Sequence, residues 1–120
     1  MLTDFSPKKV FIACGYTDLR RGLDGLTAIV EQEYGLNLFD GSLFLFCGRR
    51  ADRIKALYWD ENGLVLLYKR LESGNHFQWP RTETEAKEIT AQQYRWLMEG
   101  LRIEQPKANK PVNTEGLCYS

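Results

Sequence analysis

The side chains best suited to bind a ligand in this sequence are cations and aromatic rings gathered in one segment. The candidates are Arg49, Arg50, Arg53, Lys55, Trp59, Tyr68 and Arg70. Lys and Arg side chains neutralise phosphates, and an aromatic ring can stack on an exposed base. This combination predicts a local basic and aromatic platform for nucleic acid. The alternative is a solvated outer face, on which long cationic side chains extend past aromatic rings that pack under a loop or helix.

Residues suited to catalysis or metal binding are scattered. The single histidine, His76, follows the turn-like Ser73–Asn75 segment. The cysteines lie at widely separated positions, whereas zinc sites and disulfide frameworks need paired ligands at short spacing or even pairs. The aspartates are better explained as caps and turn residues, namely Asp18, Asp24, Asp40, Asp52 and Asp60. The sequence therefore predicts no catalytic residue, no metal site and no cofactor.

The platform depends on a β-hairpin. Two strand-like runs, 53–59 and 64–71, flank Asn62-Gly63, a pair typical of a type I′ turn because both central residues need positive φ. Such a turn places Trp59 opposite Leu66, Leu57 opposite Tyr68, Lys55 opposite Arg70 and Arg53 opposite Glu72, all on one side of the sheet. The like-charged Lys55–Arg70 pair favours an anion nearby. The other side is predicted to face the core, with Ile54, Ala56, Tyr58, Val65, Leu67 and Leu71.

The remaining elements complete a small domain. Apolar runs at 10–14 and 43–47 predict buried strands, and Phe77–Trp79 predicts a further short one. Helical spacing predicts a helix that starts at Thr17 or Asp18 and stops at Gly35. A capping box, Thr90 with Gln93, opens a second helix that runs to about Gly100, with Tyr94, Leu97, Met98 and Leu101 on its apolar side.

Taken together, the elements predict a single α+β domain over residues 8–103. In it, an antiparallel β-meander of three or four strands packs with two helices. Pro106, Pro111 and Gly116 lie in a polar sequence that predicts a flexible C-terminal tail over residues 104–120.

Composition limits the function classes. The 120 residues are 43% hydrophobic, which is enough for a core and excludes wholesale disorder. With 16 basic and 16 acidic side chains, any contact with nucleic acid must come from a local patch. The sequence has neither a long apolar run nor a signal-peptide pattern, so we expect a cytoplasmic protein with no membrane partner.

Several motifs resemble those of a known family. They are the run from Val10 to Leu26, Leu43–Phe46, the run from Arg49 to Lys55, Tyr58–Asp60, Tyr68–Gly74 and Phe77–Pro80. In this order and spacing they resemble the second-reading-frame accessory protein of bacterial insertion sequences of the insertion sequence 66 class, called TnpB in that class. The resemblance covers about residues 8–103. The sequence departs from the family pattern at Gly74–His76 and at Cys47.

The resemblance implies a role in transposition beside a separate, larger transposase, and it implies no catalytic triad. Three hypotheses follow. The protein contacts element DNA directly; or it is a protein-interaction module that docks on the transposase without touching DNA, with Trp59 and Arg70 as anchors; or it carries a nuclease or phosphotransfer activity. The transposase and element DNA are therefore the expected partners, and the sequence leaves the oligomeric state open.

Overall fold

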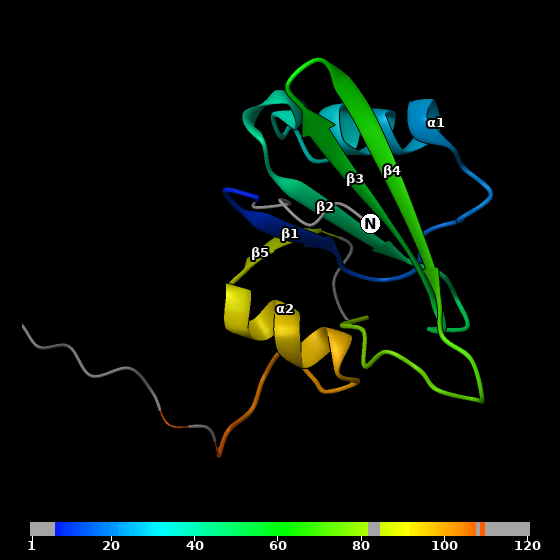
Figure 1. Ribbon diagram of the computed structural model, residues 1–120, viewed down its shortest axis with the longest axis vertical. Coiled ribbons are helices and arrows are strands. Elements are labelled where there is room, and N and C mark those ends of the chain that lie inside the picture. Colours follow the sequence, from blue (N-terminus) through cyan, green and yellow to red (C-terminus); the bar gives the residue numbers. More distant parts are fainter. Residues whose placement is uncertain (1–6, 82–84, 108, 110–120) are drawn as a thin grey trace, which may run out of the picture.

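Five strands form one mixed sheet in the computed structural model, which describes residues 7–81, 85–107 and 109 (Figure 1). The strand order is β4-β3-β2-β1-β5. The bounds are β1 Val10–Ala13, β2 Leu43–Cys47, β3 Arg53–Asp60, β4 Gly63–Arg70 and β5 Ala86–Ile89. The helices are α1 Leu23–Ala28, which continues into the π-helix η1 Ile29–Glu33, the short 3₁₀-helix η2 Leu38–Asp40, and α2 Ala91–Met98.

The α+β class is confirmed, but the sheet is not a pure antiparallel meander. Strand β1 pairs in parallel with β2, with Phe11 opposite Phe44, and α1 makes the connection between them. Parallel neighbours need such a crossover, because a tight turn can join only antiparallel strands. Strands β2, β3 and β4 form the antiparallel part that the sequence predicts.

The centre of the sheet is buried on both faces. On one face, Ile12, Leu45 and Ala56 pack with Leu97 of α2. On the other face, Phe44, Phe46 and Leu57 pack with Leu26 of α1 and with residues of η1. The expectation of one core face and one outer face for the hairpin is therefore wrong along part of its length.

The hairpin turns one residue earlier than the Asn62-Gly63 pattern predicts. Asp60 pairs with Gly63, so Glu61 and Asn62 form the turn, and Glu61 alone of these two has positive φ, at 52°. The type I′ prediction is wrong because Gly63 serves as the first residue of a strand. The predicted pairings shift by two residues, which preserves the side of every side chain. Consequently Trp59 lies opposite Leu64, Leu57 opposite Leu66, Lys55 opposite Tyr68 and Arg53 opposite Arg70.

The first helix begins later than predicted. Helix α1 starts at Leu23, after the N-cap Gly22, which makes no side-chain cap hydrogen bond. Asp18 is a loop residue: its carboxylate accepts hydrogen bonds from the backbone N–H of Arg20 and from the Arg20 guanidinium. An aspartate that bonds two residues ahead favours a turn over a helix.

The C-terminal part differs from the prediction in its strand and agrees in its helix. Phe77 and Trp79 are buried, but their segment is not a strand, and the fifth strand is Ala86–Ile89. The indole N–H of Trp79 donates to the Ala13 carbonyl at 2.8 Å. Two backbone hydrogen bonds also hold this segment, from Phe77 N–H to the Ala51 carbonyl and from Gly15 N–H to the Pro80 carbonyl. The capping box of α2 is confirmed.

Helix α2 ends at Met98, two residues before the predicted end at Gly100. Tyr94, Leu97 and Met98 pack as predicted, whereas Leu101 lies beyond the helix and is exposed. Apart from residues 104–107 and 109, the predicted tail lies outside the described residues. Cys118 lies outside them as well.

Candidate basic groove

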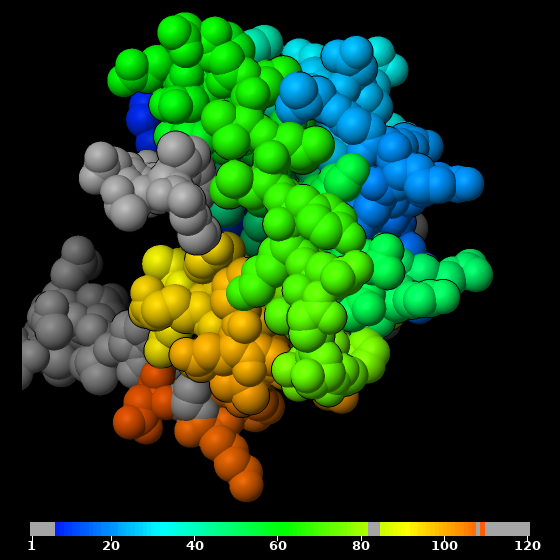
Figure 2. Space-filling model, turned by 45° about the vertical axis from the view of Figure 1, so that its right-hand side comes forward, coloured from blue at the N-terminus to red at the C-terminus, as the bar shows by residue number. Residues whose placement is uncertain are grey.

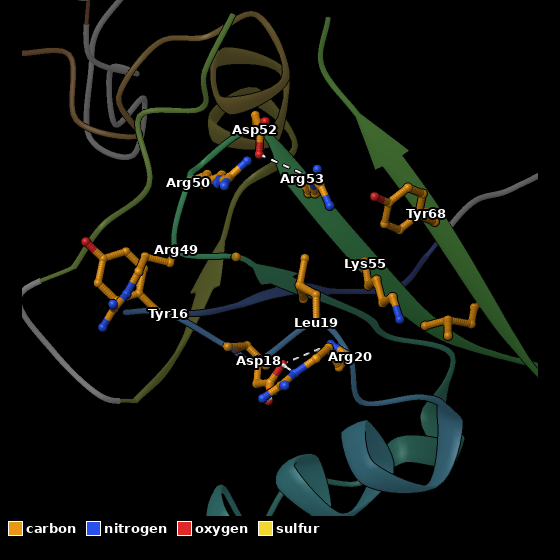
Figure 3. Close-up of a pocket in the computed structure, with 13 residues that line it drawn as sticks. Tyr16, Asp18, Leu19, Arg20, Arg49, Arg50, Asp52, Arg53, Lys55 and Tyr68 are labelled. Atoms are coloured by element: carbon orange, nitrogen blue, oxygen red, sulfur yellow. Dashed lines mark hydrogen bonds and ion pairs between the residues drawn. The ribbon is translucent and has the colours of Figure 1, made fainter. Parts of the chain in front are cut away.

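An open groove lies at the base of the β3–β4 hairpin, where three segments far apart in the sequence converge (Figure 3). Its volume is about 1100 Å³. The loop between β1 and α1 forms one wall, and the turn between β2 and β3 forms one end. Strands β3 and β4 contribute the other wall. In Figure 2 the loop (blue) and the turn (blue-green) project on the same side of the molecule with a notch between them.

The groove carries an excess of positive charge. Its cationic residues are Arg20, Arg49, Arg50, Arg53 and Lys55, and its carboxylates are Asp18 and Asp52. The whole chain has equal numbers of basic and acidic residues, so this excess is local. A concave surface with one prevailing sign of charge concentrates counter-ions and attracts anionic ligands.

Two of these cations already have carboxylate partners. Arg20 Nη2 lies 2.8 Å from Asp18 Oδ2, and these hydrogen bonds lower the pKa of Asp18 to about 2. Arg53 Nε lies 3.7 Å from Asp52 Oδ1. Arg53 Nε and Asp52 Oδ1 are both buried, and neither has a hydrogen-bond partner among the described residues. Arg53 therefore holds an unused N–H donor close to the groove.

Arg49 and Arg50 are both exposed on the turn between β2 and β3. Among the ion pairs that join described residues, none involves either of them. Their charges are therefore available to a ligand at the end of the groove that this turn forms.

A stacked cluster forms the end of the groove at Tyr16, whose side chain is 54% exposed. The guanidinium carbon of Arg81 lies 3.7 Å from the centre of the Tyr16 ring, and that of Arg49 lies 5.8 Å from it. Both distances allow cation–π attraction. Nη2 of Arg81 also donates to the Arg49 carbonyl at 3.5 Å, so Arg81 links the loop to the turn.

Backbone and side-chain contacts hold the loop against the hairpin. The Thr17 N–H donates to the Cys47 carbonyl at 2.9 Å, and Nζ of Lys55 donates to the Arg21 carbonyl at 3.0 Å. A Cβ atom added at Gly48 would lie 3.2 Å from Cδ1 of Leu19. Glycine at position 48 therefore lets the Leu19 side chain approach the backbone of the turn.

The turn between β2 and β3 has an unusual backbone. Ala51 has φ 59°, in the left-handed region that non-glycine residues rarely adopt. Three hydrogen bonds hold it there: Ala51 N–H to the Gly48 carbonyl, Gly48 N–H to the Arg53 carbonyl, and Phe77 N–H to the Ala51 carbonyl. Such strain persists only where surrounding contacts fix it, and it clusters at binding sites. These bonds fix the backbone that presents Arg49 and Arg50.

Five of the residues selected from the sequence line the groove: Arg49, Arg50, Arg53, Lys55 and Tyr68. The structure does not bring Trp59 and Arg70 into it. Trp59 packs edge-on against Phe39 of η2, with ring centres 4.9 Å apart, near the tip of the hairpin. Arg70 Nε donates to Glu72 at 2.8 Å, and this bond raises the pKa of Arg70.

Sequence reasoning missed the loop side of the groove, above all Tyr16 and Arg20, and it missed Arg81, which stacks on the Tyr16 ring. The Arg20-Arg21 pair after Tyr16 was the available signal, but the helix predicted over that segment obscured it. Arg81 gave no local signal, because its role depends on stacking against a residue 65 positions away.

Groups suited to catalysis are not assembled here. Among the described residues, no cluster of His, Cys, Asp and Glu could hold a metal ion. Burial raises the pKa of Cys47 to about 12, so this thiol is a poor nucleophile at neutral pH. His76 is exposed and lies outside the groove. None of the helices in the described residues has the length and apolar character needed to cross a membrane.

The fold and the groove define a small α+β protein with a concave basic surface. Residues 8–108 match the family model described as "IS66 Orf2 like protein", and the chain belongs to that family. Membership implies an accessory role in transposition beside the transposase of the element, and the family is not a known enzyme family.

Two relatives from Sinorhizobium fredii (strain NBRC 101917 / NGR234) are similar over nearly their whole length. Uncharacterized protein y4hO is 36% identical over 107 residues, which cover 89% of this chain and 92% of the relative. Uncharacterized protein y4jC is 31% identical over 107 residues, which cover 87% of this chain and 91% of the relative. No solved structure matches the chain.

Proposed function

We propose that the protein assists transposition by binding the DNA of its element through the basic groove. The observation that carries this proposal is the local excess of cations in a chain of zero net charge. Phosphate contacts supply most of the affinity of a DNA-binding protein, and a basic patch is sufficient to make them. Element DNA lies in the bacterial cytoplasm, where the protein would act.

Different side chains of this groove suit different parts of a nucleic acid. Arg49 and Arg50 are exposed at the end of the groove formed by the β2–β3 turn and can neutralise phosphates. The Arg53 side chain is 42% exposed and lines the groove, so the rest of its guanidinium can contact a phosphate as well. The rings of Tyr16 and Tyr68, which are 54% and 53% exposed, offer surfaces for an unstacked base.

A test compares the wild type with the double variant Arg49→Gln, Arg50→Gln, using fluorescence anisotropy on labelled DNA from the element ends. The loss of two phosphate contacts should weaken binding roughly tenfold at moderate salt. Arg95→Gln is the matched control, because Arg95 is exposed on α2, outside the groove. Equal affinity of the double variant and the wild type would reject the groove as the DNA site.

The second candidate is a module that docks on the transposase without touching DNA. The exposed Phe39 ring against Trp59 favours it, because aromatic rings are common anchors of protein interfaces. Zero net charge favours it as well. In this case the complex with the transposase survives nuclease treatment and high salt, and Phe39→Ala weakens it. If nuclease treatment alone dissociates the complex with the transposase, direct docking is contradicted.

A further inference from the structure

Tyr68 brings an exposed aromatic ring to the basic groove. Between Tyr68 and the other described residues there is neither a ring–ring contact nor a cation–π contact. Tyr16, which also lines the groove, differs because the guanidinium of Arg81 lies over its ring. The Tyr68 ring is therefore free to stack with a flat ligand.

Cations lie beside this ring on the same side of the sheet. Lys55 is directly opposite Tyr68 in the register of β3 and β4. Arg53, two residues along β3, shares the side of Lys55 because side chains alternate along a strand. Figure 3 shows the three side chains as neighbours on the two strands, and all of them line the groove. Leu66, two residues before Tyr68, adds an apolar surface on this side.

Both cations keep hydrogen-bond donors for a ligand. The only acidic partner of Arg53 among the described residues is Asp52, at 3.7 Å. Nζ of Lys55 donates to the Arg21 carbonyl, and an ammonium has three donors, so two remain. A ring for a base, flanked by cations for phosphates, is the combination with which proteins bind a single strand of nucleic acid.

The elements that usually read a DNA duplex are poorly suited to that task here. Proteins read the sequence of B-DNA by placing an α-helix or a two-stranded ribbon in the major groove. The tip of the β3–β4 ribbon carries Asp60 and Glu61, both exposed, and phosphates repel these carboxylates. Helix α1 has six residues and no cation, and α2 has Arg95 as its only cation. The cations are gathered instead in a groove that one strand can follow.

We propose that the groove binds unpaired DNA in preference to duplex, with one base stacked on the Tyr68 ring and the adjoining phosphates on Arg53 and Lys55. This inference rests on the proposed function and adds the form of DNA that the groove selects. A base inside a duplex is already paired and stacked, so it reaches the ring only at the cost of unstacking. Duplex DNA therefore meets only the cations of the groove and binds more weakly.

Fluorescence anisotropy tests the preference, with a labelled single strand of element-end sequence and with the same strand annealed to its complement. The wild type should bind the single strand roughly tenfold more tightly than the duplex at moderate salt. Tyr68→Ala should weaken single-strand binding about tenfold, because it removes one stacked base, and should leave the duplex affinity unchanged. Tyr68→Phe is the matched control, because it keeps the ring and should keep the preference.

The outcomes separate this inference from the proposed function. If the wild type binds the duplex as tightly as the single strand, or if Tyr68→Ala binds the single strand like the wild type, the preference is overturned. The groove would still be the DNA site in that case, provided that Arg49→Gln, Arg50→Gln weakens binding. If the double variant binds both forms of DNA like the wild type, the groove is not the site and the inference fails with it.

Photochemical cross-linking tests the place of the base. A single strand with iodouracil in place of thymine should cross-link to Tyr68 under ultraviolet light, as mass spectrometry of the digested protein would identify. The cross-link should be absent in Tyr68→Ala and for the duplex form of the same strand. Cross-links confined to residues outside the groove would overturn the inference.

Discussion

The two ends of the β3–β4 hairpin differ on one face, both in the residues they carry and in what surrounds them. Toward the tip, Leu57, Leu64 and Leu66 pack with residues of α1 and η1, and Trp59 packs against Phe39. Toward the base, Arg53, Lys55 and Tyr68 line an open groove. One face of one hairpin is thus core at one end and surface at the other.

The comparison shows what alternation along a strand can decide. Alternation determines which side chains share a face, and this held for the paired residues of β3 and β4. It does not determine what covers that face. Helix α1 is short and starts at Leu23, so it reaches only part of the strand, and the loop before it forms the groove wall.

Truncation at the covered end should have the largest effect on stability. Leu57 is fully buried against α1, so Leu57→Ala removes its packing and leaves a cavity. We expect a loss of about 2–5 kcal/mol in the free energy of unfolding. Tyr68→Ala, at the open end, should cost less than about 1 kcal/mol. Urea denaturation measures both, and equal losses would remove the distinction between the two ends.

The contact between the β1–α1 loop and the β2–β3 turn should have the second-largest effect on stability. In Gly48→Val the new side chain would crowd Leu19, which a Cβ atom already approaches at 3.2 Å. We expect a loss of about 1–3 kcal/mol, typical of overpacking. Leu19→Ala in the same chain should recover part of that loss. If the two changes are additive in thermal melts, the contact does not position the loop.

Replacing Lys55 should lower the free energy of unfolding by less than Gly48→Val does. Its ammonium donates to the Arg21 carbonyl, so Lys55→Met should cost about 0.5–1.5 kcal/mol. The sequence alone favours a neutral or stabilising change, since it places Lys55 opposite Arg70. In the structure Lys55 lies opposite Tyr68, and no such repulsion is relieved. A stabilising Lys55→Met in denaturant melts would contradict the observed register.

Gly63→Val should have the smallest effect. Gly63 has no positive φ, and a Cβ atom added there meets nothing within 4 Å. A β-branched residue suits a strand, so the change should stay within about 0.5 kcal/mol or be stabilising. A loss above about 1 kcal/mol in the same melts would indicate the type I′ turn at Asn62-Gly63.

Local signals predicted much of the fold. Strands β1 and β2 are apolar runs, and β3 and β4 alternate on the two sides of a turn signal. The N-terminus of α2 has a capping box that depends only on Thr90 and Gln93. Strand β5 escaped prediction because Ala86–Ile89 carries two charged residues and is a strand only through its pairing with β1. The parallel placement of β1 beside β2 has no local signal either.

The candidate site was predicted only in part, because local signals group only residues that are neighbours in the sequence. The turn residues Arg49 and Arg50 and the hairpin residues Arg53, Lys55 and Tyr68 are neighbours in sequence, and alternation was enough to group them. The opposite wall comes from residues 16–20, which only the three-dimensional fold brings close. Trp59 lies outside the groove, where its ring packs against Phe39 of η2. No sequence pattern predicted this contact.

The salt dependence of DNA binding tests the central claim most directly. On duplex DNA from the element ends, the slope of log K against log salt concentration is about −0.9 for each phosphate neutralised. Arg49→Gln and Arg50→Gln together should make the slope less negative by about 1.8, while the free energy of unfolding stays unchanged. Arg95→Gln should leave the slope unchanged. The absence of binding at low salt, or one common slope for the wild type and the double variant, would contradict the account.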